Sequence, residues 1–179
     1  MTFTIYLLRH AHAAWAQPGE RDFDRSLDER GRKDAHRMAN LFVRHDLTID
    51  HVVCSTARRC VETLEVIQAG GALLGEVTFT DRLYANDHHG YVNEIASVKS
   101  GESVLFVGHN PMMADTVAAL LAASETAPPK KALSFPTAAL AVIELEVQAG
   151  GDEPTGPRRT AAPFSKARLM HFFTPKDAK

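Results

Sequence analysis

The sequence contains little cysteine, little net charge and no long hydrophobic run. Its only two cysteines, Cys54 and Cys60, are too few for a disulfide framework and are not spaced like metal ligands, so we expect two buried thiols. The 20 Lys and Arg residues nearly balance the 22 Asp and Glu residues, and a net charge of −2 supplies no field for broad binding to nucleic acid or to an anionic membrane. Apolar stretches such as residues 117–123 are far shorter than the roughly 20 residues that span a bilayer.

What the composition does contain is typical of one globular domain. The chain has 179 residues, of which 45% are hydrophobic and 23% are charged, and this excludes a disordered chain, a coiled coil and a collagen-like rod. We therefore expect residues 1–179 to form a single domain. The apolar start at residues 5–8 is interrupted at once by Arg9, so no signal peptide is expected and the predicted location is the cytoplasm.

Predicted strands and helices alternate along the chain. Short apolar runs rich in β-formers predict strands, and apolar residues spaced three and four apart predict helices between them. The predicted strands are residues 3–8, 51–54, 77–79, 103–107, 139–147 and 167–173, and the predicted helices begin near Leu27, Ser55, Tyr91 and Asn110. Residues 149–163, rich in glycine and proline, predict an exposed loop. This order predicts an α/β fold with three α-β-α layers, a mostly parallel sheet and an antiparallel edge strand.

Basic side chains follow three of the predicted parallel strands at the point where each strand ends. Arg9 and His10 follow the first strand, Arg58 and Arg59 lie shortly after the second, and His109 follows a later one. The carboxyl ends of parallel strands meet at one edge of the sheet, where ligands bind in this kind of fold. Arginine forks and helix N-termini favour phosphate oxygens, so we expect a phosphate or sulfate anion to bind there. The sequence therefore predicts a phosphoryl site that contains a nitrogen nucleophile.

Each of these segments also has a plainer interpretation. A single arginine or histidine at a strand end is more often a packing or surface residue. Arg58 and Arg59 point about 100° apart on a helix, so only one of them faces inward. A metallohydrolase is a second possibility, in which a metal would be held by some of the histidines His10, His12, His88, His89 and His109. No dense set of carboxylates accompanies those histidines. A module that binds phosphoproteins without catalysis is a third possibility.

Several short motifs occur together along the chain. They are Leu8-Arg9-His10-Ala11 with Trp15, Leu27-x-x-Arg30-Gly31, Gly108-His109-Asn110-Pro111, Phe135-Pro136-Thr137 and Phe173-x-Pro175. In this combination the sequence resembles the histidine phosphatase superfamily, and within it the short SixA-type phosphohistidine phosphatases. The resemblance runs over residues 4–175. It implies a phosphatase that needs no metal or cofactor and takes part in signal transduction. The substrate it implies is a phosphohistidine-bearing protein, and a small phosphorylated molecule is the alternative.

The resemblance also implies a role for individual residues. His10 corresponds to the nucleophile that accepts the phosphoryl group, and Arg9, Arg59 and His109 correspond to the phosphate pocket, which leaves Arg58 outside the site. His10 would attack phosphorus in line and form a phosphohistidine enzyme, which water then hydrolyses. Arg9, Arg59 and His109, the last if protonated, would stabilise the charge on the transferred oxygens.

The chain departs from the family pattern at a few positions. The family signature Ser-Pro-x-x-Arg-x-x-Gln-Thr corresponds to residues 55–63, with its arginine at Arg59. In this motif Thr56 replaces the usual proline and Glu62 replaces the usual glutamine, and neither change removes a catalytic group. Larger relatives also carry a glutamate general acid, and its motif is not recognisable here. Asp81, Asp87 and Glu94 lie in the corresponding region, and the sequence does not choose among them. Alkyl phosphates are therefore expected to be poor substrates.

Overall fold

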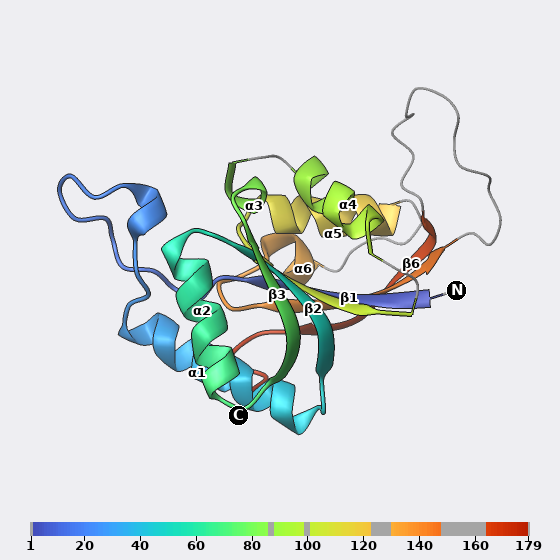
Figure 1. The fold of residues 1–179 in the computed structure, drawn as a ribbon, viewed down its shortest axis with the longest axis horizontal. Helices are drawn as coiled ribbons and strands as arrows, with labels where there is room; N and C mark the ends of the chain where they lie inside the picture. Colours follow the sequence, from blue (N-terminus) through green and yellow to red (C-terminus); the bar gives the residue numbers. More distant parts are fainter. Residues whose placement is uncertain (1, 86–87, 99–100, 123–129, 148–163, 179) are drawn as a thin grey trace.

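The protein is built on one six-stranded sheet, with strand order β3-β2-β4-β1-β5-β6 (Figure 1). The computed structural model describes residues 2–85, 88–98, 101–122, 130–147 and 164–178. The strands are β1 Thr2–Arg9, β2 Thr48–Ser55, β3 Leu73–Thr80, β4 Ser103–Gly108, β5 Leu140–Val147 and β6 Phe164–Phe173. Strand β1 lies inside the sheet, between β4 and β5.

Most of the strand pairs are parallel. Strand β1 pairs in parallel with β4, and β2 pairs in parallel with both β3 and β4. Strand β5 is antiparallel to β1, and β6 is antiparallel to β5. The predicted α/β fold with a mostly parallel sheet is therefore confirmed, and the edge strand β6 is antiparallel to its neighbour. The reversal at β5 also brings the residues just before it beside the end of β1, where Arg9 N donates to the Ala139 carbonyl.

Helices cover both faces of the sheet, as the predicted three layers require. On one face lie α1 (Glu29–Arg44) and α2 (Arg58–Ala69), and on the other lie α3 (Arg82–Ala85), α4 (His88–Ala96), α5 (Met112–Ala122) and α6 (Lys130–Ser134) (Figure 1). Successive side chains of a strand point to opposite faces, so β1 contributes to both cores. Leu8 packs in the core that contains α1 and α2, and Leu7 packs in the core that contains α5.

Helix α1 begins later than the sequence predicts, at Glu29 rather than near Leu27. Asp28 is its N-cap and accepts a hydrogen bond from Gly31 N at 2.7 Å, an arrangement that stabilises a helix by about 1 kcal/mol. The second carboxylate oxygen of Asp28 lies 2.6 Å from His12 Nδ1. The cap of α1 therefore also fixes the chain segment that follows β1.

The edge strand β3 is longer than the predicted strand at 77–79. No strand among the described residues pairs with its outer edge, and much of β3 is exposed, including Leu73 and Phe79. Polar residues such as Glu76 are tolerated there, and they interrupt the apolar run from which a strand is recognised.

Cys54 and Cys60 are buried and free, as predicted. The loop predicted at 149–163 lies outside the described residues. Among the residues that the structure describes, no helix is both long enough and apolar enough to cross a membrane.

Candidate active site

The strand ends that carry the predicted basic residues meet at one edge of the sheet. Strands β2, β4 and β1 are consecutive in the strand order, and Arg9 at the end of β1 is in register with Gly108 at the end of β4. His10 N donates to the Gly108 carbonyl at 2.9 Å. The rings of His10 and His109 consequently lie side by side, with their centroids 5.2 Å apart.

Arg59 contacts both of these histidines. Its Nε donates to His10 Nε2 at 3.2 Å, its Nη2 donates to His109 Nδ1 at 3.3 Å, and only 6% of the residue is exposed. Arg58 precedes it by about 100° around α2 and points outward, where it pairs with Glu62 at 2.8 Å. Of the two adjacent arginines, Arg59 therefore lies in the histidine cluster and Arg58 lies outside it.

The hydrogen bonds of His10 define its tautomer. Nδ1 lies 2.7 Å from the Ala11 carbonyl, which can only accept, so Nδ1 carries the proton. Nε2 is then unprotonated, and its lone pair accepts from Arg59. Burial, with smaller contributions from the nearby His109, Arg59 and Arg9, lowers the pKa of His10 to about 3, although the bond to Ala11 opposes this. At neutral pH the ring is uncharged and offers a nucleophilic nitrogen.

His109 is also neutral and is held from three sides. Its Nδ1 accepts from Arg59, so its Nε2 carries the proton and donates to Ser55 Oγ at 2.9 Å. Its backbone N donates to the Tyr91 hydroxyl at 3.0 Å. Burial and the charges of Arg59 and Arg9 lower the pKa of His109 to about 3, although Asp22 opposes this. A cationic His109, as considered from the sequence, would therefore need the negative charge of a bound phosphoryl group.

Arg9 is the second cation beside the histidines. Its Nη1 donates to the Phe135 carbonyl at 2.8 Å. Its Nε is buried and has no hydrogen-bond partner among the described residues. Burial and the neighbouring charge of Arg59 lower the pKa of Arg9. Arg9 therefore retains donor capacity beside His10.

Thr63 and Glu62, which follow Arg59 on α2, tie the loop after β1 to this helix. Thr63 Oγ1 accepts from Ala11 N at 3.0 Å and donates to the Arg59 carbonyl at 2.6 Å. Glu62 is buried and accepts from Leu27 N at 2.8 Å. Glu62 also accepts from Arg58. The glutamate that replaces the family glutamine therefore has a structural role, since it joins the segment before α1 to α2.

The sequence reasoning missed three residues that complete the cluster. Asp22 belongs to a short 3-10 helix, η1 (Asp22–Asp24), and its carbonyl and Oδ2 accept from Arg59 at 2.6 and 2.9 Å. Arg25 donates to Asp22 Oδ1 at 2.7 Å, and the Tyr84 hydroxyl donates to Oδ2 at 3.1 Å. Arg25, chiefly, holds the pKa of Asp22 at about 2. The Tyr84 ring also packs edge-on against His109, with centroids 5.3 Å apart.

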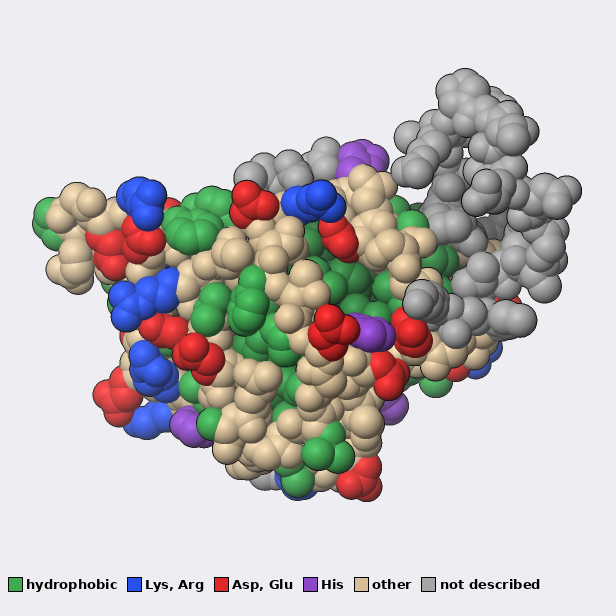
Figure 2. Space-filling model, in the orientation of Figure 1, with side chains coloured by type: hydrophobic (Ala, Val, Ile, Leu, Met, Phe, Trp, Pro, Cys, Tyr) green, Lys and Arg blue, Asp and Glu red, His purple; other side chains and the backbone are tan. Residues whose placement is uncertain are grey.

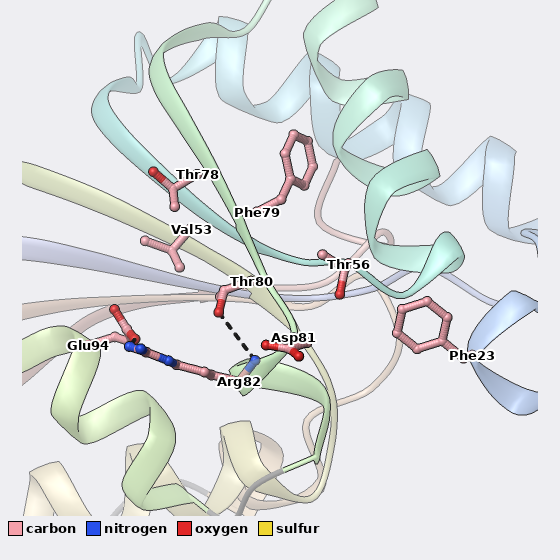
Figure 3. Close-up of a pocket in the computed structure, with 9 residues that line it drawn as sticks. All are labelled: Phe23, Val53, Thr56, Thr78, Phe79, Thr80, Asp81, Arg82 and Glu94. Carbon is pink, nitrogen blue, oxygen red and sulfur yellow. Dashed lines mark hydrogen bonds and ion pairs between the residues drawn. The ribbon is translucent and has the colours of Figure 1, made fainter.

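Two of the three candidate general acids lie beside this cluster rather than in it. Asp81 and Glu94 line a cavity of about 720 Å³ together with Phe23 of η1, Thr56 and residues of β2 and β3 (Figure 3). Glu94 forms an ion pair with Arg82 at 3.2 Å. The described lining of the cavity includes neither histidine of the cluster. Asp87 lies outside the described residues.

The metal-site alternative can be compared with the same geometry. Within the part of the chain that the structure describes, no three His, Cys, Asp or Glu side chains are grouped so that they could hold a metal ion. His12, one of the histidines considered for such a site, lies instead against Asp28.

The lowered pKa values of the two histidines predict that stability falls in mild acid. Both rings must stay neutral in the folded protein, whereas in the unfolded chain they protonate near pH 6.5, so acid favours unfolding. The free energy of unfolding should fall below pH 6.5, by up to about 1.4 kcal/mol per pH unit for each histidine, until the pH approaches the folded-state value of about 3.

Urea unfolding at pH 7 and pH 5 measures this dependence. A His10→Gln/His109→Gln variant should lose much less stability between the two pH values than the parent protein, and His36→Gln, at an exposed position on α1, should behave like the parent. An equal loss in all three proteins would contradict the neutral state assigned to the two rings.

Comparisons with known proteins identify the family of this chain. Residues 5–85 match the histidine phosphatase superfamily (branch 1). The SixA protein from Agrobacterium tumefaciens, a proposed phosphohistidine phosphatase, is 33% identical, with 96% of this chain and 97% of that one covered and a TM-score of 0.74. A second such SixA protein, from Nakamurella multipartitia, is 30% identical over 81% of this chain and 86% of its own, with a TM-score of 0.68.

A curated relative is similar over most of its length. An uncharacterized protein of Mycobacterium tuberculosis (strain CDC 1551 / Oshkosh) is 30% identical over 143 residues, which are 77% of this chain and 87% of that protein. The resemblance inferred from the short motifs is thus confirmed by matches that extend over the whole fold. This chain belongs to the histidine phosphatase superfamily, as a phosphatase of its SixA type.

Proposed function

We propose that this phosphatase removes the phosphoryl group from a phosphohistidine side chain of a protein, and that His10 carries the group between the two halves of the reaction. The observation that carries the proposal is the state of His10. Its ring is neutral, its Nδ1 proton is held by the Ala11 carbonyl, and the lone pair of Nε2 lies beside Arg59. The two SixA proteins, themselves proposed phosphohistidine phosphatases, support the same substrate class.

The reaction proceeds in two displacements at phosphorus. In the first, a bond forms from His10 Nε2 to phosphorus while the P–N bond of the substrate breaks, and its electron pair returns to the substrate ring. In the second, water attacks phosphorus, the electron pair of the P–N bond returns to His10 Nε2, and the protons of the water leave with the phosphate. The proton of His10 stays on Nδ1 throughout, where it is donated to the Ala11 carbonyl.

Fixed cations supply the charge stabilisation that both displacements need. Arg59 and Arg9 donate to the equatorial oxygens of the phosphoryl group. His109 lies next to His10 and donates as well once the charge of the bound phosphoryl group favours its protonation. Because these groups are held by Asp22, Phe135 and Ser55, they need little reorganisation when charge develops. The residues themselves provide this function without a metal ion.

The rate is expected to depend strongly on the leaving group. A positioned general acid contributes about 10²–10⁴ in rate. Asp22 is the carboxyl group in contact with Arg59, and its pKa of about 2 leaves it ionised, with no proton to donate. An imidazole leaves easily once its second nitrogen is protonated, whereas an alkoxide does not. kcat/KM should therefore rank phosphohistidine above aryl phosphates, and aryl phosphates far above alkyl phosphates.

A series of aryl phosphates of graded phenol pKa measures that dependence. The rate should rise as the phenol becomes more acidic, and Asp81→Asn, Asp87→Asn and Glu94→Gln should leave the slope unchanged. A flat dependence in the parent enzyme, with chemistry rate-limiting, would mean that an acid is present. The variant that then steepened the slope would identify it.

The substrate class itself is tested with a phosphohistidine-containing phosphotransfer protein as substrate. Phosphate release should continue in EDTA, and inorganic phosphate or sulfate should compete with the substrate. Hydrolysis of small phosphate esters without any hydrolysis of protein phosphohistidine would instead support a small-molecule phosphomonoesterase.

A further inference from the structure

The Asp22 carboxylate is a negative charge placed at a site for anions. It lies on η1, outside the sheet, and 53% of its side chain is exposed. Its two oxygens accept from Arg25, Arg59 and the Tyr84 hydroxyl. Arg59 is the residue that contacts both histidines, so Asp22 lies one side chain away from His10.

Orienting Arg59 does not by itself require this charge. The backbone carbonyl of Asp22 already accepts from Arg59 Nη1 at 2.6 Å, and His10 and His109 accept from its other nitrogens. A neutral amide at position 22 would still offer an oxygen to Nη2. The negative charge must nevertheless repel a phosphoryl dianion that approaches His10, because like charges a few ångströms apart disfavour each other. The charge therefore opposes binding of an ordinary phosphate ester.

A phosphohistidine differs from such an ester in the charge of its leaving group. When the second ring nitrogen is protonated, the phosphorylated imidazole carries a positive ring beside the negative phosphoryl group. A carboxylate accepts strongly from such a cationic N–H. Oδ1 of Asp22 has one described donor, Arg25, and a carboxylate oxygen can accept two. The exposed rim position leaves room for an approaching ring.

We infer that Asp22 determines specificity, because its carboxylate pairs with the cationic ring of a protonated phosphohistidine and repels phosphate esters. This inference rests on the proposed function. In the first displacement the P–N bond breaks, its electron pair returns to the ring nitrogen, and the other nitrogen keeps its proton, so a neutral imidazole leaves. Asp22 remains ionised throughout, and it acts by favouring the protonated, reactive form of the bound substrate.

The test compares Asp22→Asn with a matched control, Asp24→Asn. Asp24 lies on the same 3-10 helix and pairs with Arg21 at 2.7 Å, away from Arg59. The substrates are N-phosphoimidazole and p-nitrophenyl phosphate, and inorganic phosphate is the inhibitor. In Asp22→Asn we expect kcat/KM to fall about fivefold for N-phosphoimidazole and to rise about fivefold for p-nitrophenyl phosphate, the scale of one partly exposed charge pair. The inhibition constant of phosphate should fall as well, and Asp24→Asn should change none of the three.

Changes in the same direction for both substrates would overturn the inference. A loss with both would mean that Asp22 only positions Arg59, and a gain with both would mean that it only obstructs the site. If the parent enzyme hydrolyses neither N-phosphoimidazole nor a phosphohistidine protein, the proposed function fails and the inference fails with it. If the parent hydrolyses them and only the opposite changes are missing, the inference alone fails.

Discussion

Replacing His10 by alanine is expected to abolish phosphate release and the phosphoenzyme together. The Nε2 lone pair of His10 is the nucleophile in the proposed mechanism. Burial keeps the ring neutral, and the hydrogen bond to the Ala11 carbonyl keeps the ring proton on Nδ1, which leaves Nε2 unprotonated. Without that nitrogen no covalent intermediate forms. The measurement is a rapid quench with radiolabelled phosphohistidine protein, followed by detection of acid-labile label on the enzyme.

His12→Ala is the matched control for this experiment. His12 is two residues further along the chain, but its Nδ1 lies against Asp28 at the start of α1 and not in the histidine cluster. Its loss should leave both turnover and phosphoenzyme nearly intact. A labelled phosphoenzyme trapped in His10→Ala would overturn the assignment of the nucleophile.

Replacing Arg59 by alanine is expected to lower kcat/KM by about 10²–10³, the usual effect of removing one donor to a developing negative charge. Arg59 is almost fully buried and contacts His10, His109 and Asp22, so its removal also frees these groups from their present orientation. Arg59→Lys keeps the charge but not the planar fork, and it should recover only part of the activity. Steady-state kinetics at pH 7 give the comparison.

Arg58→Ala is the corresponding control, because Arg58 is adjacent in sequence but exposed and paired with Glu62. It should cost little activity. Urea unfolding of both alanine variants separates a catalytic loss from a loss of folded protein. A large effect of Arg58→Ala with a small effect of Arg59→Ala would mean that the family motif has been placed one residue too late.

Much of the site could be predicted because its residues lie on, or at the ends of, regular strands and helices. Alternation of strands and helices predicts a parallel sheet, and the edge rule for such sheets places Arg9, His10 and His109 together. The helical period requires that one of Arg58 and Arg59 face inward, and the family motif selects Arg59. These inferences depend on periodic patterns, which a sequence displays directly.

The rim of the site, formed by Asp22, Arg25 and Tyr84, could not be predicted from the sequence. No helical or strand periodicity relates these residues to Arg59. Asp22 and Arg59 are 37 residues apart, and their contact depends on how the loop after β1 folds back over α2. Nothing in the local sequence distinguishes Asp22 from Asp24, its neighbour on the same 3-10 helix. The extent of β3 was underestimated for a related reason, since an exposed edge strand needs few apolar residues.

The space-filling view shows the surface around the edge strand β3. On the face of the molecule that carries β3, basic side chains lie mainly at the left of the view, next to acidic ones, whereas acidic side chains also extend to the right, and apolar side chains are exposed between the charged groups (Figure 2). Phe79 on β3 is half exposed and lines the cavity beside the histidine cluster. Mixed charge of this kind agrees with the balanced composition from which broad binding to nucleic acid was excluded.

The backbone hydrogen bonds of His10 have a consequence for the activity of the enzyme under mild denaturing conditions. His10 N donates to the Gly108 carbonyl and its own carbonyl accepts from Ala138 N, so the proposed nucleophile is held between neighbouring segments at the end of the inner strand β1. Asp22, by contrast, lies on an exposed turn. Exposed turns open in local fluctuations that need far less free energy than global unfolding, whereas central strands open only with the whole domain. Mild denaturing conditions would therefore loosen the segment that carries Asp22 before they open the sheet. The enzyme would then still transfer phosphoryl groups but would discriminate less between its substrates.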